Sequence, residues 1–205
     1  YALSIDAGTQ VWSFIAGAAI EAPPLLIGDL LVVGALDGIV YALDARTGAL
    51  RWRATTDGKI VGSANWAATD DGRTLILVGS YDNCMYAFDA ATGVRVWRFK
   101  TGNYINGAPA VANGMVVFGG CDAQLRALCV TSGVELVSVD ADAYVAASAA
   151  LAGDRAFVGN YNGKLICVDL VDASIVWEYE NPDRAAPFFS CPAVAGDRIV
   201  VGGRD

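Results

Sequence analysis

The sequence predicts an all-β fold, a β-propeller of four-stranded antiparallel blades with about five repeats present. Three observations lead to this prediction. The pattern Ala-x-Asp-x-x-Thr-Gly-x-x-x-Trp occupies residues 42–52 and returns at residues 87–97. Its tryptophan position recurs at intervals of 40, 45, 40 and 40 residues along the chain. Short runs of β-branched and aromatic residues, each bounded by glycine and a turn, alternate with these motifs, as expected for short strands.

Weaker copies of the motif keep the same register on both sides of the two complete ones. The aspartate of the motif precedes a turn in which a short polar side chain can bond nearby backbone amides. The tryptophan position reads Trp12, Trp52, Trp97, Val137 and Trp177, and the glycine position four residues earlier reads Gly8, Gly48, Gly93, Gly133 and Ala173.

A second block recurs in the same phase. It is an apolar run that ends in glycine and is followed three residues later by Asp or Asn. Asp37-Gly38 and Asn162-Gly163 are hairpin signals, because glycine accepts the positive φ of a tight primed turn. Each unit therefore holds four strands, of which the second ends at the block's glycine and the fourth carries the tryptophan. The glycines are Gly34, Gly79, Gly119, Gly159 and Gly202.

In chain order, residues 1–15 are expected to form an outer half-blade and residues 181–205 an inner half-blade. Four complete blades lie between them, at residues 16–54, 55–99, 100–139 and 140–180. We expect the chain to be an arc of a longer propeller with seven or eight blades. The alternative is a five-bladed ring, closed by the outer half at residues 1–15 against the inner half at residues 185–205, which would remove exposed sheet edges.

The repeated motif resembles the tryptophan-docking motif of propellers of the pyrroloquinoline-quinone (PQQ) type. That family includes quinoprotein alcohol dehydrogenases and the non-enzymatic, BamB-like envelope proteins, to which the chain is most similar. The resemblance implies that each Trp packs against the Ala of its own motif and the Gly region of the neighbouring blade. The docking residues it implies are Trp12, Ala42, Gly48, Trp52, Ala87, Gly93, Trp97 and Trp177.

Composition excludes several classes of function. The net charge of −8 argues against nucleic acid, because nucleic-acid binders neutralise phosphates with Lys and Arg. No apolar run approaches the roughly 20 residues of a membrane-spanning helix, which leaves peripheral membrane association open. The five cysteines form no Cys-x-x-Cys pair, so a metal site is not expected. The absence of histidine removes the commonest general base, and no catalytic residue is predicted.

The segments that join each fourth strand to the next first strand are the expected binding region. They cross one face of a propeller toward its central channel, and binding residues concentrate on such loops. Here they are rich in aromatic and small polar residues, which would equally suit packing at the mouth of the channel. The candidate residues are Glu21, Asn65, Trp66, Tyr104, Asn106, Tyr144, Phe188 and Phe189.

The favoured function is a non-catalytic, BamB-like scaffold that binds protein or peptide segments and has no cofactor. By resemblance its location is the bacterial periplasm or cell envelope, although a cytoplasmic location stays open. The first alternative is a fragment of a PQQ-dependent dehydrogenase, in which Glu21 would help to hold calcium and Trp66 would lie under the quinone. The second is a propeller that binds a small ligand or a sugar with the same aromatic residues.

Overall fold

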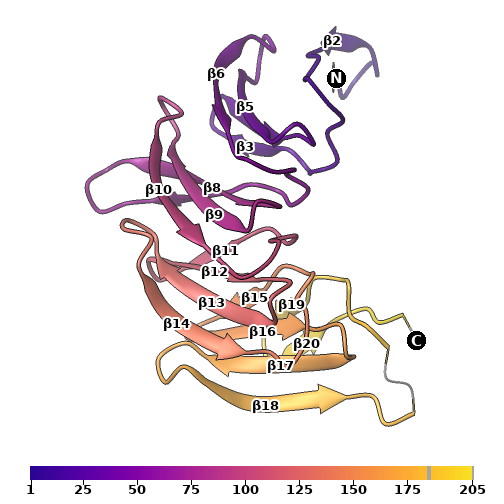
Figure 1. Cartoon of the computed structure of the whole chain (residues 1–205). Coiled ribbons are helices and arrows are strands. Elements are labelled where there is room, and N and C mark those ends of the chain that lie inside the picture. The colour runs from indigo at the N-terminus through magenta and orange to yellow at the C-terminus, as the bar shows by residue number, and fades with distance from the viewer. Residues whose placement is uncertain (184–185, 205) are drawn as a thin grey trace.

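The computed structural model describes residues 1–183 and 186–204, and within them it contains strands and no helix. The predicted all-β fold is confirmed. Antiparallel sheets follow one another from the indigo N-terminal end to the yellow C-terminal end, as in successive propeller blades (Figure 1). The part of the expected inner half-blade at residues 184, 185 and 205 lies outside the described residues.

Four sheets have four strands each, paired in the order of the chain. In each of them a short first strand is followed by three longer ones, and the fourth strand forms one edge. Their strands are β3 (Leu25–Ile27), β4 (Leu30–Gly34), β5 (Ile39–Asp44) and β6 (Leu50–Thr55); β7 (Asn65–Ala68), β8 (Thr74–Ser80), β9 (Cys84–Asp89) and β10 (Arg95–Lys100); β11 (Ala110–Ala112), β12 (Met115–Gly119), β13 (Gln124–Cys129) and β14 (Glu135–Asp140); β15 (Ala150–Ala152), β16 (Arg155–Gly159), β17 (Lys164–Asp169) and β18 (Ser174–Glu180).

The two ends of the described chain form separate two-stranded sheets, β1 (Ala2–Leu3) with β2 (Gln10–Trp12), and β19 (Ala193–Ala195) with β20 (Arg198–Val200). Figure 1 places these two sheets at opposite ends of the arc. In the described residues β1–β2 therefore does not pair with β19–β20, and the five-bladed ring considered above is not formed.

The turn between the third and fourth strands is built by the motif's aspartate. Asp44 Oδ1 accepts hydrogen bonds from the amides of Arg46 and Thr47 and from the Thr47 hydroxyl, at 2.9–3.0 Å. Arg51 binds the second carboxylate oxygen, and this ion pair together with the Thr47 bonds holds the pKa of Asp44 at about 2. Asp89 makes the same three turn bonds in the next sheet, so the sequence repeat is a repeat of turn geometry.

The core lies between successive sheets, because the sheets in the middle of the arc are covered on both faces. Along β8 the side chains alternate, and Ile76 and Val78 pack toward the preceding sheet, whereas Leu75 and Leu77 pack toward the following one. All four are fully buried. Continuous apolar strands are the expected sequence pattern when both faces of a sheet are covered.

Trp52 lies at the boundary between two of these sheets. It pairs across strands with Ala42 of its own motif, and its indole Nε1 donates a 2.8 Å hydrogen bond to the carbonyl oxygen of Ala90. A Cβ atom placed on Gly93 would approach the Trp52 ring to 2.7 Å, so the ring lies directly on that glycine. Trp12 and Trp97 repeat the arrangement on Gly48 and Gly133.

Candidate functional site

The segments expected to carry binding residues lie beside the turns between second and third strands. In an up-and-down blade, the turn after the second strand and the connection after the fourth strand are at the same end of the sheet. Backbone bonds confirm this proximity, since the Tyr81 amide binds the Lys59 carbonyl and the Tyr161 amide binds the Tyr144 carbonyl, both at 2.9 Å. The Cys121 amide binds the Tyr104 carbonyl at 2.8 Å.

Each connecting segment that follows a four-stranded sheet is anchored by one buried apolar residue that packs on the glycine of that sheet. A Cβ atom on Gly79 would lie 2.4 Å from Ile105 Cγ2, a contact that only glycine permits. Val145 packs in the same way on Gly119. The Ile105 amide also donates to Ser80, and the Val145 amide donates to Gly120, so side chain and backbone fix the segment together.

The anchors hold the neighbouring aromatic side chains at the surface. Tyr104 stacks on Tyr81 with ring centroids 4.8 Å apart and an interplanar angle of 8°. Tyr161 makes edge contacts with Tyr144 on one side and with Phe189 on the other. Tyr104, Tyr144, Tyr161 and Phe189 are 42–53% exposed. We call the five residues Tyr81, Tyr104, Tyr144, Tyr161 and Phe189 the aromatic row.

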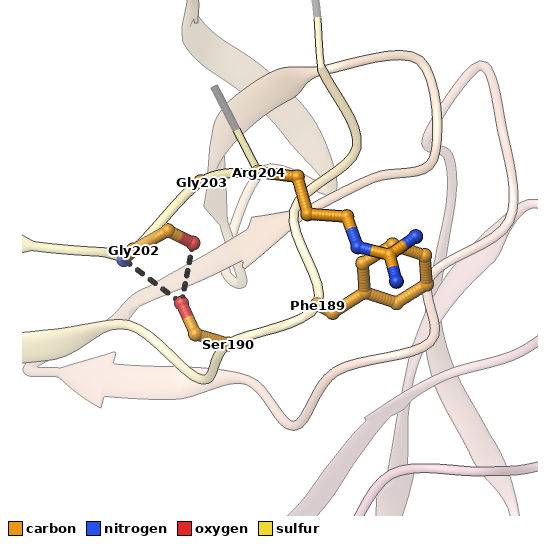
Figure 2. Close-up of a pocket in the computed structure, with 5 residues that line it drawn as sticks. All are labelled: Phe189, Ser190, Gly202, Gly203 and Arg204. Atoms are coloured by element: carbon orange, nitrogen blue, oxygen red, sulfur yellow. Dashed lines mark hydrogen bonds between the residues drawn. The ribbon is translucent and has the colours of Figure 1, made fainter.

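The C-terminal end of the aromatic row borders a cavity of about 330 Å³ (Figure 2). The Arg204 guanidinium lies over the Phe189 ring, 4.9 Å from its centroid, a cation–π geometry. The Ser190 hydroxyl donates to the Gly202 carbonyl and accepts from the Gly202 amide. The cavity is thus lined by an aromatic ring and a cation that contact each other, whereas Ser190 is occupied by the backbone.

At the other end of the aromatic row, the surroundings of Tyr81 keep its phenol uncharged. Burial of the ring raises the pKa of Tyr81, and the nearby Cys121 and Glu21 raise it further. The phenol therefore stays protonated at neutral pH and remains a hydrogen-bond donor. Glu21, one of the residues predicted for the site, is exposed close enough to act on Tyr81 through its charge.

The remaining predicted residues have different positions. The Asn65 amide nitrogen donates to the Pro109 carbonyl at 2.9 Å, so Asn65 joins two successive sheets. Trp66 is 42% exposed on the first strand β7. Asn106 Nδ2 contacts Cys121 Sγ at 3.3 Å. Phe188 is 8% exposed and packs on Gly159, so it anchors the segment whose neighbour Phe189 faces solvent.

Sequence reasoning missed Tyr81 and Tyr161, which complete the aromatic row. Both stand two residues after the glycine near the end of a second strand, in Gly79-Ser-Tyr-Asp and Gly159-Asn-Tyr-Asn. The sequence signal was this shared position, at the same end of the sheet as the connecting segments. The connecting segments alone therefore do not contain the complete row.

The residues present do not fit a PQQ–calcium site. Glu21, the residue expected to hold calcium, is exposed, and the neighbouring amide oxygen Asn65 Oδ1 already accepts a hydrogen bond from the Trp66 backbone amide. Within residues 1–183 and 186–204, no three His, Cys, Asp or Glu side chains gather as a metal site would require. In the same part of the chain, no helix is long and apolar enough to cross a membrane.

Comparison with known families gives one match that covers most of the chain. The model of the family described as "Outer membrane protein assembly factor BamB" matches residues 36–143 and 122–205. No curated protein sequence matches the chain significantly.

Solved structures show the same fold at low sequence identity. BamB from Moraxella catarrhalis superposes with a TM-score of 0.76 at 20% identity, over 95% of this chain and 59% of that protein. The chain thus spans little more than half of that relative. The quinohemoprotein alcohol dehydrogenase ADHIIG from Pseudomonas putida HK5 matches with a TM-score of 0.67 at 19% identity, over 85% of this chain and 36% of its own. The computationally designed Ika8 protein matches with a TM-score of 0.62 at 16% identity, over 91% of this chain and 68% of its own.

Proposed function

The chain belongs to the family of the outer membrane protein assembly factor BamB, and from this premise we propose that it is a non-catalytic scaffold that binds extended segments of protein partners. The observation that carries the proposal is the aromatic row, which is exposed but held rigidly on anchored segments. Rigid aromatic side chains supply large contact area at a low cost in conformational entropy. Family membership supports a location in the bacterial cell envelope.

The chemistry of the row favours a peptide with apolar side chains. Exposed ring faces suit apolar and aromatic side chains, and the neutral Tyr81 phenol can donate to a backbone carbonyl. Strands of outer-membrane proteins alternate apolar and polar residues and present such side chains at every second position. We therefore expect one edge of an extended strand to lie along the aromatic row.

The test is calorimetric titration of the chain with a synthetic extended peptide that alternates aromatic and polar residues. We expect Tyr104→Ala and Tyr144→Ala each to weaken binding about five- to ten-fold, a typical loss for an aromatic anchor. The matched control is Tyr179→Ala, because Tyr179 is as exposed, at 52%, but lies on the outer strand β18. An equal loss in the control variant contradicts the assignment of binding to the aromatic row.

The same titration distinguishes peptide binding from the alternative that the row binds a sugar. A soluble oligosaccharide could stack on the same tyrosine faces, whereas it cannot present alternating aromatic side chains. If the oligosaccharide binds saturably and the peptide does not, the row binds a small ligand and the scaffold proposal is wrong. Binding of the peptide alone supports it.

A further inference from the structure

The position two residues after each glycine of the recurring apolar block lies beside a connecting segment. Tyr81 and Tyr161 of the aromatic row occupy this position, and their amides bind the carbonyls of the connecting segments. In the last repeat the same position holds Arg204, so a cation follows where the repeat would place another member of the row. The residues at this position are Leu36, Tyr81, Cys121, Tyr161 and Arg204.

The Arg204 side chain is held by contact with the end of the aromatic row. Its guanidinium lies 4.9 Å from the centroid of the Phe189 ring (Figure 2). Tyr161 makes an edge contact with the same ring, with centroids 5.4 Å apart and an interplanar angle of 86°. A guanidinium that already rests on a ring loses less conformational freedom when it binds a ligand than a free side chain does.

The charge of Arg204 is not compensated by the chain. Arg51, Arg126 and Lys164 each lie 2.6–3.0 Å from a carboxylate oxygen. Arg204 is exposed, and within residues 1–183 and 186–204 it has no ion-pair partner. The ring of Phe189 offers no oxygen or nitrogen acceptor, so the contact with it leaves the guanidinium N–H groups available to a ligand.

These N–H groups belong to a residue that lines the cavity of about 330 Å³ (Figure 2). None of the described residues that line this cavity is acidic. Gly202 and Gly203 add no side chain that would crowd a ligand, and the Ser190 hydroxyl is already bonded to Gly202. Arg204 is therefore the polar side chain of this lining that is free to recognise a bound group.

We propose that Arg204 binds a carboxylate of the extended partner, beside an apolar side chain that packs on the aromatic row. The inference rests on the proposed scaffold function and specifies the charge of the partner at one end of the row. A guanidinium can donate a pair of parallel N–H···O bonds to a carboxylate, which adds specificity to the ionic attraction. Because the net charge of the chain is −8, a carboxylate at any other position of the partner is repelled.

The experiment is calorimetric titration with peptides that are acetylated, amidated and alternate aromatic with neutral polar residues. One polar position, at either end or in the centre, is Asp in one peptide and Asn in its partner peptide. An Asp at an end position should tighten binding about three- to ten-fold relative to Asn, as for a well-placed ion pair near a surface. An Asp in the centre should give no gain. Equal affinities of all Asp and Asn peptides, or the same gain at the centre, overturn the proposal.

Removal of the charge then locates the site. Arg204→Gln keeps a side chain of similar shape, and it should abolish the preference for Asp while the Asn peptide binds as before. The matched control is Arg198→Gln, because Arg198 is 84% exposed and begins β20 at the turn from β19, whereas Arg204 lies beyond the other end of that strand. A preference that survives in Arg204→Gln, or that is lost equally in Arg198→Gln, overturns the assignment.

A third peptide distinguishes the two sources of a carboxylate. It has Asn at the end position and a free C-terminal carboxylate in place of the amide. A gain from this peptide that Arg204→Gln abolishes assigns the site to a chain terminus, whereas a gain from Asp alone assigns it to a side chain; either result supports the proposal.

The same titrations separate failure of this inference from failure of the scaffold function. If the peptides bind, and Tyr104→Ala weakens them, but no carboxylate improves binding, only the inference is wrong. If no peptide binds, both are wrong.

Discussion

At the scale of single residues, the tryptophan positions explain why glycine recurs four residues before them. Gly93 has a φ of +73° and lies under the Trp52 ring, so both its backbone conformation and its missing side chain are required. Gly72 has a similar φ of +83°, but nothing lies within 4 Å of a Cβ atom placed there. Substitutions at Gly72 and Gly93 therefore distinguish the cost of a positive φ from the cost of a steric clash.

We predict that Gly93→Ala lowers the free energy of unfolding by about 2–4 kcal/mol, and Gly72→Ala by only about 1 kcal/mol. The second variant carries only the strain of a positive φ, whereas the first also pushes the indole away from its glycine. Urea denaturation of both variants measures the difference. Equal losses would mean that the close contact between Trp52 and Gly93 contributes nothing to stability.

A cysteine in the turn motif gives the second prediction at this scale. Cys129 occupies the position held by Asp44 and Asp89, and hydrogen bonds from the Ser132 hydroxyl and amide lower its pKa. Burial raises the pKa of Cys121, although both side chains are partly exposed. The thiolate is the reactive form, so Cys129 should be alkylated faster than Cys121 near neutral pH.

Peptide mass spectrometry after timed treatment with iodoacetamide measures both rates in one sample. Ser132→Ala should slow the reaction of Cys129 and leave that of Cys121 unchanged, because it removes the first of the bonds that favour the thiolate. A faster reaction at Cys121 would show that access, and not the turn, controls reactivity.

At the scale of strands and sheets, one blade boundary lacks tryptophan. At this boundary the tryptophan position and the glycine position of the motif have changed together. Val137 replaces tryptophan on β14 and packs with Leu170 in the core between two sheets. The next glycine position holds Ala173, which has a φ of +52°. A Cβ atom is tolerated there because the residue that would cover it is small.

We predict that Val137→Trp destabilises the chain by about 1–3 kcal/mol, since the indole would meet the Ala173 side chain. Adding Ala173→Gly should restore more stability than Ala173→Gly contributes alone, with a coupling of at least about 1 kcal/mol. A double-mutant cycle by urea denaturation measures this coupling. Additive effects would mean that Val137 and Ala173 are not in the contact made by Trp52 and Gly93.

Sequence predicted these elements well because their determinants are local. The turn glycines and the period of the motif specify four strands for each unit, and the structure has four-stranded sheets there. The site was harder to predict, because exposure depends on which neighbour of a buried anchor points outward. Phe188 and Phe189 are chemically alike, and only the packing of Phe188 on Gly159 distinguishes them. Likewise, the stacking of Tyr81 on Tyr104 joins residues 23 positions apart.

At the scale of the whole molecule, the core is divided among boundaries between successive sheets. Trp97 packs with Val116, Phe118 and Leu128 of the following sheet. The boundary beyond that sheet is built by other residues, Val117 and Ala127 among them. In such a linear arrangement each unit is stabilised by its neighbours, so damage at one boundary should remain local.

We predict that Trp97→Ala, at a cost of about 3–5 kcal/mol, opens the boundary between β7–β10 and β11–β14 while the distant strands keep their protection. Hydrogen exchange followed by mass spectrometry should show faster exchange in β9 and β12 and wild-type exchange in β16 and β17. Val94→Ala is the matched control, because Val94 lies three residues before Trp97 but is 64% exposed, and it should change no segment. Uniformly faster exchange in all sheets would instead show one cooperative unit, in which the boundaries communicate along the entire arc.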